Sequence, residues 1–338
     1  MKLPQWLITG MVTMMLAGCG EQSASAPPAN VAVNPNAKRL ALVQLSDVGI
    51  TEGADKDILQ GLAESGMTEG TDFTIMRMSA QSDLPTLMSL VDNAVMQGAD
   101  LIIPLQPQTL QACLTRKVTL PTVFHLAAAP FRLGAGTTDT DHAANLTGSY
   151  MLDPLVAFDT FCAMLRAANP QLTRLATLCD PGSIPSSSYV ESLTAAAARR
   201  GFTVASVPVT EPIALLPAVA ALLDRKPEAI VLVPFTALDD NPELLIKRAA
   251  EQGIPCIGTI EYHARCGAPL TIGVDCHEGG VLAGKMIARI LRGESPGVIP
   301  LFVMQTPEAY EHVALARKYG LVLPEPFRIF VRPLPAAA

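Results

Sequence analysis

The sequence contains few charged residues. Asp, Glu, Lys and Arg make up 16% of its 338 residues, and 31 acidic residues outnumber 24 basic ones, which gives a formal net charge of -7 at pH 7. No run of more than two Lys or Arg occurs along the chain. Binding to nucleic acid depends on clustered basic side chains that neutralise phosphates. We therefore expect no nucleic acid among the partners of this protein.

Sequence motifs of catalysis are also missing. Gly134-Ala-Gly136 has neither the third glycine nor the strand-to-helix context of a dinucleotide-binding fingerprint. Ser183 and the serines from Ser186 to Ser188 do not form a nucleophile elbow, and no His–Asp arrangement accompanies them. The sequence therefore predicts neither an enzyme nor a bound cofactor.

The cysteines do not form a metal-binding pattern. Seven are present, and the six after Cys19 permit disulfides in an oxidising compartment, but their spacing decides no pairing. Most of them lie in apolar surroundings, which favours buried free thiols. Three of them lie near His263 and His277, yet none forms a Cys-x-x-Cys pair. We expect no metal site. The six are Cys113, Cys162, Cys179, Cys256, Cys266 and Cys276.

Long apolar runs are absent beyond the amino terminus. There, Lys2 precedes an apolar run from Trp6 to Leu16, which is too short and too interrupted to span a membrane. A basic start, a short apolar run and small residues are typical of a secretory signal. The cysteine after Leu16-Ala-Gly narrows this prediction to a bacterial lipoprotein signal (1–18), with Cys19 as the lipidated first mature residue. We expect a protein of the periplasm, anchored to a membrane through Cys19.

The segment 19–37 is rich in Ser, Ala, Pro and Asn and is predicted to be a flexible tether. Beyond it, strand and helix patterns alternate, pause near 145–148, and begin again, which predicts parallel sheets covered by helices on both faces. A Ser188-Tyr-Val-Glu191 capping box is predicted to open one helix. The predicted strands are 39–45, 73–78, 100–105, 121–126, 172–179, 203–207, 229–233, 255–258, 270–274 and 299–303. The predicted helices are 52–65, 84–97, 109–116, 154–168, 188–201, 213–223, 242–252, 279–291 and 310–319.

Several segments resemble the periplasmic substrate-binding proteins of ABC transporters, in the branch whose characterised members bind tryptophan or tyrosine. They are 62–70, 98–103, 145–148, 273–275, 284–294 and 316–324, and the resemblance runs from Leu40 to Pro324. It implies an α/β fold of two Rossmann-like lobes with parallel sheets, joined by a hinge, in the type I-like manner of these proteins. Lobe 1 would comprise 38–148 and 278–296, and lobe 2 would comprise 149–277 and 297–333. The ligand would bind in the cleft by hinge closure and pass to an ABC permease.

Candidate ligand-binding residues follow the ends of the predicted strands, because open parallel sheets bind ligands beyond the carboxyl ends of their strands. Several of these residues also have a simpler interpretation, as a helix cap, a packing residue or a solvated loop charge. The candidates are Ser46, Asp47, Gln81, Gln106, Ala128, Pro130, Phe131, Ser187, Tyr189, Phe235, Glu261, Tyr262 and Asp275.

The expected cleft is more apolar than a zwitterionic amino acid prefers. Relatives commonly have Thr-Asp-Pro where this chain has Ala128-Ala129-Pro130, and aromatic residues where it has Cys276-His277. No Arg falls clearly within a cleft loop to pair with a carboxylate, and a buried charge needs a counter-charge. We expect a monomer that binds a largely apolar or amphipathic ligand, such as an aromatic compound or a sterol. The alternatives are a carrier of lipid-like molecules between membranes and a ligand-presenting subunit of a membrane sensor.

Overall fold

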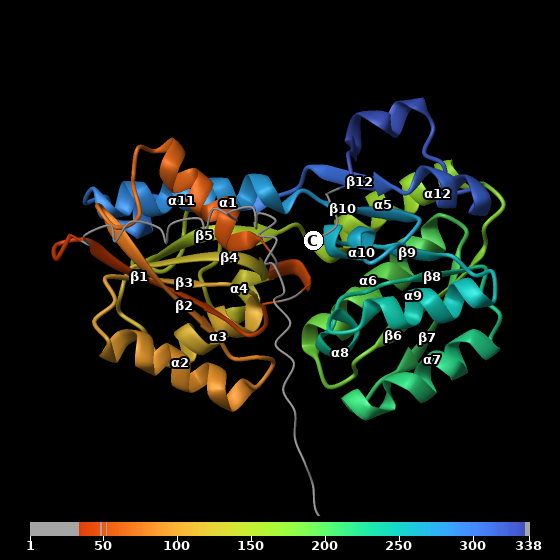
Figure 1. The fold of residues 1–338 in the computed structure, drawn as a ribbon, viewed down its shortest axis with the longest axis horizontal. Helices are drawn as coiled ribbons and strands as arrows, with labels where there is room; N and C mark the ends of the chain where they lie inside the picture. Colours follow the sequence, from red (N-terminus) through yellow and green to blue (C-terminus); the bar gives the residue numbers. More distant parts are fainter. Residues whose placement is uncertain (1–33, 48, 52, 335–338) are drawn as a thin grey trace, which may run out of the picture. The chain divides into compact units, whose positions relative to one another are not determined.

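Two sheets, each packed against helices on both faces, make up the described part of the chain (Figure 1). The computed structural model describes residues 34–334, apart from Val48 and Glu52. The predicted signal peptide, Cys19 and most of the predicted tether lie outside the described residues. The predicted α/β class with two lobes is confirmed.

The first sheet has the strand order β11-β5-β4-β3-β1-β2, and its strands pair in parallel. The central strands β3 and β4 are buried along their whole length. A parallel sheet covered on both faces requires such burial, which explains why these strands are continuous apolar runs. The strands are β1 (Lys38–Gln44), β2 (Phe73–Ser79), β3 (Leu101–Pro104), β4 (Thr122–Ala128), β5 (Leu146–Met151) and β11 (Phe302–Met304).

Alternate residues of β1 divide the core of the first lobe between the two faces of its sheet. Leu40 and Leu42 pack with α1 (Ala54–Glu64) and α11 (Cys276–Leu291), whereas Ala41 and Val43 pack with α2 (Leu84–Met96) and α3 (Pro107–Thr115). Helices α1 and α11 lie side by side (Figure 1). A Cβ atom on Gly284 would overlap the carbonyl oxygen of Ile58, so only glycine permits this approach of the two backbones.

The second sheet has the order β13-β12-β10-β9-β8-β6-β7. It is parallel except for β12, which pairs antiparallel with β10. Helices α5 and α6 pack on one face of this sheet, and α7 and α9 pack on the other. The strands are β6 (Arg174–Cys179), β7 (Thr203–Pro208), β8 (Ala229–Val231), β9 (Cys256–Gly258), β10 (Leu270–Val274), β12 (Pro307–Glu311) and β13 (Val331–Arg332). The four helices are α5 (Pro154–Ala168), α6 (Ile184–Arg199), α7 (Leu215–Asp224) and α9 (Pro242–Glu251).

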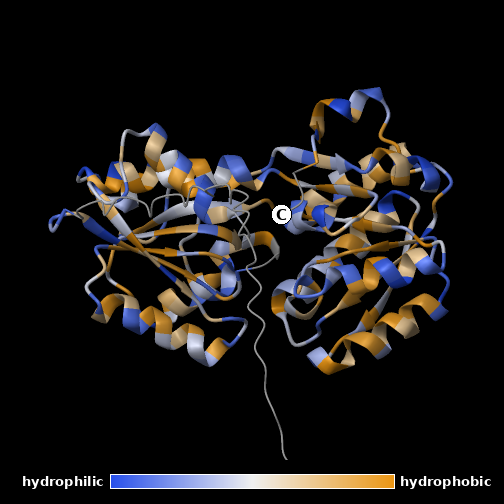
Figure 2. Cartoon of the chain, viewed as in Figure 1, coloured by the Kyte–Doolittle hydropathy of each residue, from blue (hydrophilic) through white to orange (hydrophobic). Residues whose placement is uncertain are grey.

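Short helices occupy the loops and the tail. They are α4 (Pro130–Leu133), α8 (Thr236–Asp239), α10 (Glu261–Arg265) and α12 (Val313–Tyr319), together with the 3-10 segments Gly49–Thr51, Pro212–Ala214, Pro296–Val298 and Glu325–Phe330. In Figure 2 the strands of both sheets are largely hydrophobic, and the helices alternate hydrophobic and hydrophilic residues. None of the helices between residues 34 and 334 is long and apolar enough to span a membrane. In the same range the six cysteines are free.

The sheets place two domain boundaries later than we expected. Strand β5 continues the first sheet to Met151, beyond the expected boundary after Gly148. Strand β11 pairs with β5, so residues up to Met304 belong with the first lobe rather than starting the second at 297. Helix α11 returns to the first lobe and β12 joins the second sheet, as the resemblance implied.

Two local predictions are wrong. Helix α6 is capped by Ser183, whose hydroxyl oxygen accepts from the Ser186 N–H, and the expected capping box at Ser188 lies inside this helix. The expected tail helix over 310–319 begins only at Val313, because the preceding residues pair with β10 as β12. At α6 a different local cap, Ser183, sets the start of the helix, whereas at α12 the pairing of β12 with β10 decides where the helix begins.

Candidate ligand-binding site

A cavity lies at the carboxyl ends of strands from both sheets. From the first sheet, Ser46 follows β1, Gln106 follows β3 and Met151 ends β5; from the second, Thr259 follows β9 and Val274 ends β10. We call this space the first cavity. Its position is where open parallel sheets bind their ligands. The sequence-based prediction of the position of the site therefore agrees with the geometry.

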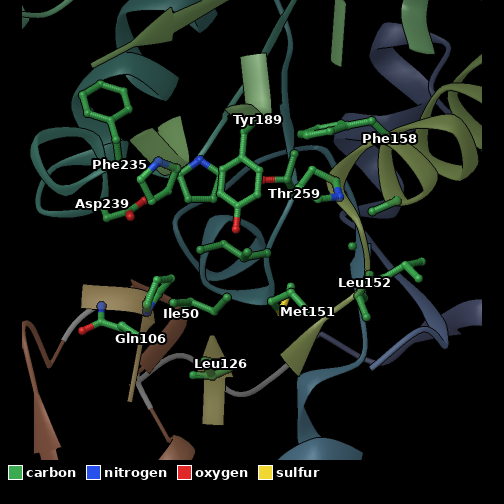
Figure 3. Close-up of a pocket in the computed structure, with 18 of the residues that line it drawn as sticks. Ile50, Gln106, Leu126, Met151, Leu152, Phe158, Tyr189, Phe235, Asp239 and Thr259 are labelled. Carbon is green, nitrogen blue, oxygen red and sulfur yellow. The ribbon is translucent and has the colours of Figure 1, made fainter. Parts of the chain in front are cut away.

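The walls of the first cavity are mostly apolar and partly aromatic. Figure 3 shows Phe158, Tyr189 and Phe235 on one side, facing Ile50, Leu126 and Met151 on the other. Phe158 and Tyr189 pack edge to face, with ring centroids 6.3 Å apart. Burial raises the pKa of Tyr189 to about 12, so its hydroxyl stays protonated and available as a donor at neutral pH. These walls suit the flat body of an aromatic molecule. The aromatic lining is Phe158, Phe161, Tyr189 and Phe235.

The backbone is strained at two residues that line the first cavity. Gln106 has φ 73° and Leu126 has φ 60°, in the region that side-chain-bearing residues rarely adopt. The side-chain oxygen of Gln106 accepts from the N–H groups of Leu45 and Ser46, at 3.0 and 3.3 Å, which fixes the loop after β1. Leu126 lies where the register between β4 and β5 shifts. Such a backbone conformation costs about 1–3 kcal/mol per residue and persists only where the surrounding structure imposes it. Residues of this kind often occur at ligand-binding sites.

Asp239 is the most unusual polar group of the first cavity. Its side chain is 17% exposed, and its Oδ1 atom lies 3.7 Å from Nε2 of the fully buried His263. The Thr259 N–H donates to Nδ1 of this histidine at 3.2 Å, which assigns the ring proton to Nε2, on the side facing Asp239. The separation of 3.7 Å is too long for a hydrogen bond. Among the residues described, neither of the two facing atoms has a hydrogen-bond partner. Burial raises the pKa of Asp239, and the nearby imidazole only partly opposes this shift.

The charge that lines the first cavity is of one sign. Asp239 and Asp240 are its acidic residues, and the described lining contains no Lys, Arg or His. Burial, and then repulsion by Asp47, raise the pKa of Asp240. The remaining polar lining is neutral. It consists of Ser46, Gln106, Gln108, Thr160, Ser183, Tyr189, Thr236, Thr259 and Gln305.

A second cavity lies where the chain crosses from β10 into α11, and it is lined by charges that have partners. Asp57 on α1 contacts His277 on α11 at 2.8 Å, and the Tyr310 hydroxyl donates to Glu308 at 3.0 Å. Arg332 lies 3.5 Å from Asp275. Burial is the main cause that raises the pKa of Glu308, to about 8. Its lining includes Asp57, His125, Glu261, Tyr262, Arg265, Asp275, Cys276, His277, Glu308, Tyr310 and Arg332.

A comparison with protein families identifies the chain. Residues 46–332 match the family described as ABC transporter substrate binding protein. The chain belongs to this family. Such substrate-binding proteins hold a solute and are not enzymes, which confirms what the sequence predicted. The resemblance noted from sequence segments is thereby confirmed as well.

Individual members of the substrate-binding family are distant in sequence but similar in fold. A tyrosine-binding protein of Clostridioides difficile (strain R20291) is 22% identical over 310 residues, which cover 91% of this chain and 89% of that protein. A domain from Streptococcus pneumonia in complex with L-Trp has a TM-score of 0.78 at 20% identity, covering 88% of this chain and 99% of that one. A conserved domain protein from Vibrio cholerae has a TM-score of 0.77 at 20% identity, with the same coverage. These structures confirm the two-lobed fold.

The structure of this substrate-binding protein divides the residues that the sequence singled out into three groups. Four line the first cavity: Ser46, Gln106, Tyr189 and Phe235. Three line the second cavity: Glu261, Tyr262 and Asp275. Six line neither cavity: Asp47, Gln81, Ala128, Pro130, Phe131 and Ser187. All thirteen stay predictions of ligand contact.

Packing explains why some of the candidates lie away from the cavities. Phe131 is partly buried and packs edge to face on Tyr150, with ring centroids 5.6 Å apart, against a core cluster that contains Phe124. Pro130 is buried at the start of α4. Asp275, which does line the second cavity, also serves as the helix cap that one interpretation predicted, since its carboxylate accepts from the N–H groups of His277 and Glu278 at 3.0 and 3.3 Å.

Sequence reasoning missed several lining residues of the first cavity. Asp239 and Asp240 lie at the end of the short helix α8, beyond Phe235, the candidate that the sequence placed after this strand end. Phe158 and Phe161 belong to α5, and their spacing predicts only an apolar helix face. That this face borders a cavity follows from how α5 packs with α6. The one sequence signal that could have pointed to Asp239 and Asp240 was that they are acidic residues shortly after the end of a strand.

Proposed function

We propose that this protein is the lipid-anchored ligand-capturing component of an ABC transporter, and that it holds a small amphipathic, aromatic molecule in the first cavity. The observation that carries the proposal is the shared lining of this cavity. Loops of both sheets contribute to it, with aromatic side chains and a few polar groups. A ligand that contacts both lobes at once stabilises the closed state, because the full set of contacts exists only there. The protein would therefore capture its ligand by hinge closure.

The known ligands of relatives support the choice of an aromatic molecule. One relative is named for binding tyrosine, and another was solved with L-Trp bound. The walls formed by Phe158, Tyr189 and Phe235 supply the apolar contact that an aromatic body requires. A burial of this kind contributes roughly 25 cal/mol for each Å² of apolar surface removed from water.

Calorimetric titration of the full-length protein in detergent tests the proposal. We expect micromolar binding of at least one small aromatic amphiphile from a panel of aromatic amino acids, amines, phenols and acids. Tyr189→Ala should weaken that binding at least about tenfold, because it removes one wall of the cavity. Tyr319→Ala is the matched control, since this half-buried tyrosine lies outside both cavities. A sterol that co-purifies with the protein, with no binding across the panel, would contradict the proposal and favour a lipid carrier.

The anchor is a separate part of the proposal. Cys19 follows Leu16-Ala-Gly, and a lipid there would hold the binding protein in the periplasm close to its permease, which raises the effective concentration for delivery. Cells fed a labelled fatty acid should transfer label to the wild-type protein and not to Cys19→Ser. The variant should also leave the membrane fraction. Equal labelling of the two proteins would refute the anchor and leave the ligand proposal standing.

A further inference from the structure

The first cavity has an unbalanced charge that the proposed function does not yet use. Its described lining carries two carboxylates, from Asp239 and Asp240, and no cationic side chain. Lys2 is the one basic residue of the chain outside residues 34–334, and it lies in the predicted signal peptide. No cation of the described part therefore lies in the cavity lining to balance these carboxylates.

Asp239 is the carboxylate best placed to meet a ligand. It lies at the edge of the cavity on the same side as Phe235 (Figure 3). The neutral imidazole of His263 faces it at 3.7 Å without forming a hydrogen bond. A buried carboxylate without a cationic partner is costly, and a cation supplied by the ligand would remove that cost.

The aromatic rings favour the same kind of ligand. A cation close to the face of Tyr or Phe is attracted by the electrons of the ring, and the attraction is stronger where water is excluded. Tyr189 and Phe235 lie on the same side of the cavity as Asp239 (Figure 3). An ammonium group at Asp239 would thus have a carboxylate and aromatic surroundings, while an aromatic or alkyl body extends toward Leu126 and Met151.

A carboxylate on the same ligand finds a poorer environment. The lining offers it no Arg or Lys, and burial of an unpaired carboxylate is unfavourable. The donors that the lining leaves for it are neutral, namely hydroxyls such as that of Tyr189 and backbone N–H groups where α3, α5 and α6 begin. A neutral donor compensates a buried carboxylate less well than a cationic partner does.

We propose that the first cavity selects small organic cations, namely amphipathic aromatic amines that carry an ammonium group and no carboxylate, with Asp239 as the residue that binds the ammonium. This inference rests on the proposed function and narrows its ligand class. It predicts that the protein prefers an amine to the amino acid with the same ring.

Matched ligand pairs test the preference. The full-length protein is titrated by calorimetry with tyramine and tyrosine, with tryptamine and tryptophan, and with 4-ethylphenol as an uncharged analogue. We expect each amine to bind at least tenfold more tightly than its amino acid, which corresponds to a difference of about 1.4 kcal/mol in binding free energy. Tighter binding of the amino acids would overturn the inference and leave the proposed function intact. If none of these ligands binds while another member of the aromatic panel does, the inference is overturned and the proposed function stands; if nothing in the panel binds, the proposed function itself fails.

Substitution of Asp239 tests the assigned residue. Asp239→Asn keeps the shape of the side chain and removes its charge, so the affinity for the amine should fall at least about tenfold while that for 4-ethylphenol stays the same. Asp224→Asn, an exposed carboxylate at the end of α7, is the control and should change neither affinity. Thermal melting of the variants verifies that they are folded. An unchanged affinity of Asp239→Asn for the amine would refute the assignment.

Discussion

The two cavities of this protein differ in how their charges are satisfied. In the second cavity Asp57 contacts His277 at 2.8 Å, and Glu308 accepts from the Tyr310 hydroxyl at 3.0 Å. In the first cavity Asp239 lies 3.7 Å from a neutral imidazole and has no hydrogen-bond partner at its Oδ1 atom among the described residues. A charge that already has its partner supports the structure around it, whereas one without a partner is available to a ligand.

Loss of an aromatic side chain should destabilise the protein much more at the first cavity than at the second, and this is the largest difference we expect between them. Phe158 is 7% exposed and packs against Phe161 and Tyr189, so Phe158→Ala should lower the free energy of unfolding by about 3–5 kcal/mol. Tyr262 lines the second cavity and lies with Arg265 5.6 Å over its ring, and Tyr262→Ala should cost about 1 kcal/mol or less through loss of that contact. Urea unfolding measures both. Equal losses of unfolding free energy would show that the aromatic wall of the first cavity contributes no more to the core than Tyr262 does.

Glu308 should give the second cavity a pH-dependent stability. Its folded-state pKa of about 8 lies above the ordinary 4.5, so between these values the folded protein holds a proton that the unfolded chain has lost. Stability must therefore fall as the pH rises through that window. Melting temperatures from pH 5 to 8.5 should show this decline, and Glu308→Gln should flatten it. The exposed Glu191→Gln should leave the profile of the wild type unchanged.

Removal of charge should have opposite effects in the two cavities. Asp239→Asn replaces an unpaired carboxylate, so the ligand-free protein should become more stable by about 1 kcal/mol. His277→Ala leaves Asp57 without its partner and should destabilise the protein by about 1 kcal/mol or less, because this contact is partly exposed. Thermal unfolding without ligand determines both signs. Destabilisation by Asp239→Asn would mean that His263 is a sufficient partner for Asp239.

The contact between Arg332 and Asp275 should have the smallest effect. The atoms are 3.5 Å apart and the Arg332 side chain is 46% exposed, so Arg332→Ala should change the free energy of unfolding by less than about 1 kcal/mol. The change should become smaller still in high salt, because salt screens exposed charges. Urea unfolding at two salt concentrations measures it. A larger, salt-independent loss would show that the second cavity depends on this pair.

Much of the fold was predictable because the evidence for it is local. Buried strands such as Leu101–Pro104 are short apolar runs, and Asp83 before Pro85 predicts the start of α2, where its carboxylate accepts from the Thr86 N–H at 2.8 Å. Strand β12 was not predictable in this way, because Pro307–Glu311 is a strand only through its antiparallel pairing with β10. Pairing between segments distant in the chain has no local signature.

The candidate site was predictable only in part, for a related reason. Gln106 and Phe235 follow strand ends, so the rule for parallel sheets found them. Phe131 also follows a strand, yet α4 directs it into the core against Tyr150. Asp239 was missed because it lies at the end of α8 rather than directly after a strand. Its importance comes from His263, which is 24 residues away in the chain and 3.7 Å away in space.

The α/β class, the two lobes and the family could be predicted from the sequence alone, because apolar periodicity and the order of the family's segments do not depend on contacts between distant parts of the chain. The tertiary structure decided which of the strand-end residues share a cavity, and that the charges of one cavity are paired while Asp239 in the other is not. The physical reason is that burial and electrostatic pairing depend on the neighbours that folding brings together, whereas periodicity depends only on neighbours along the chain.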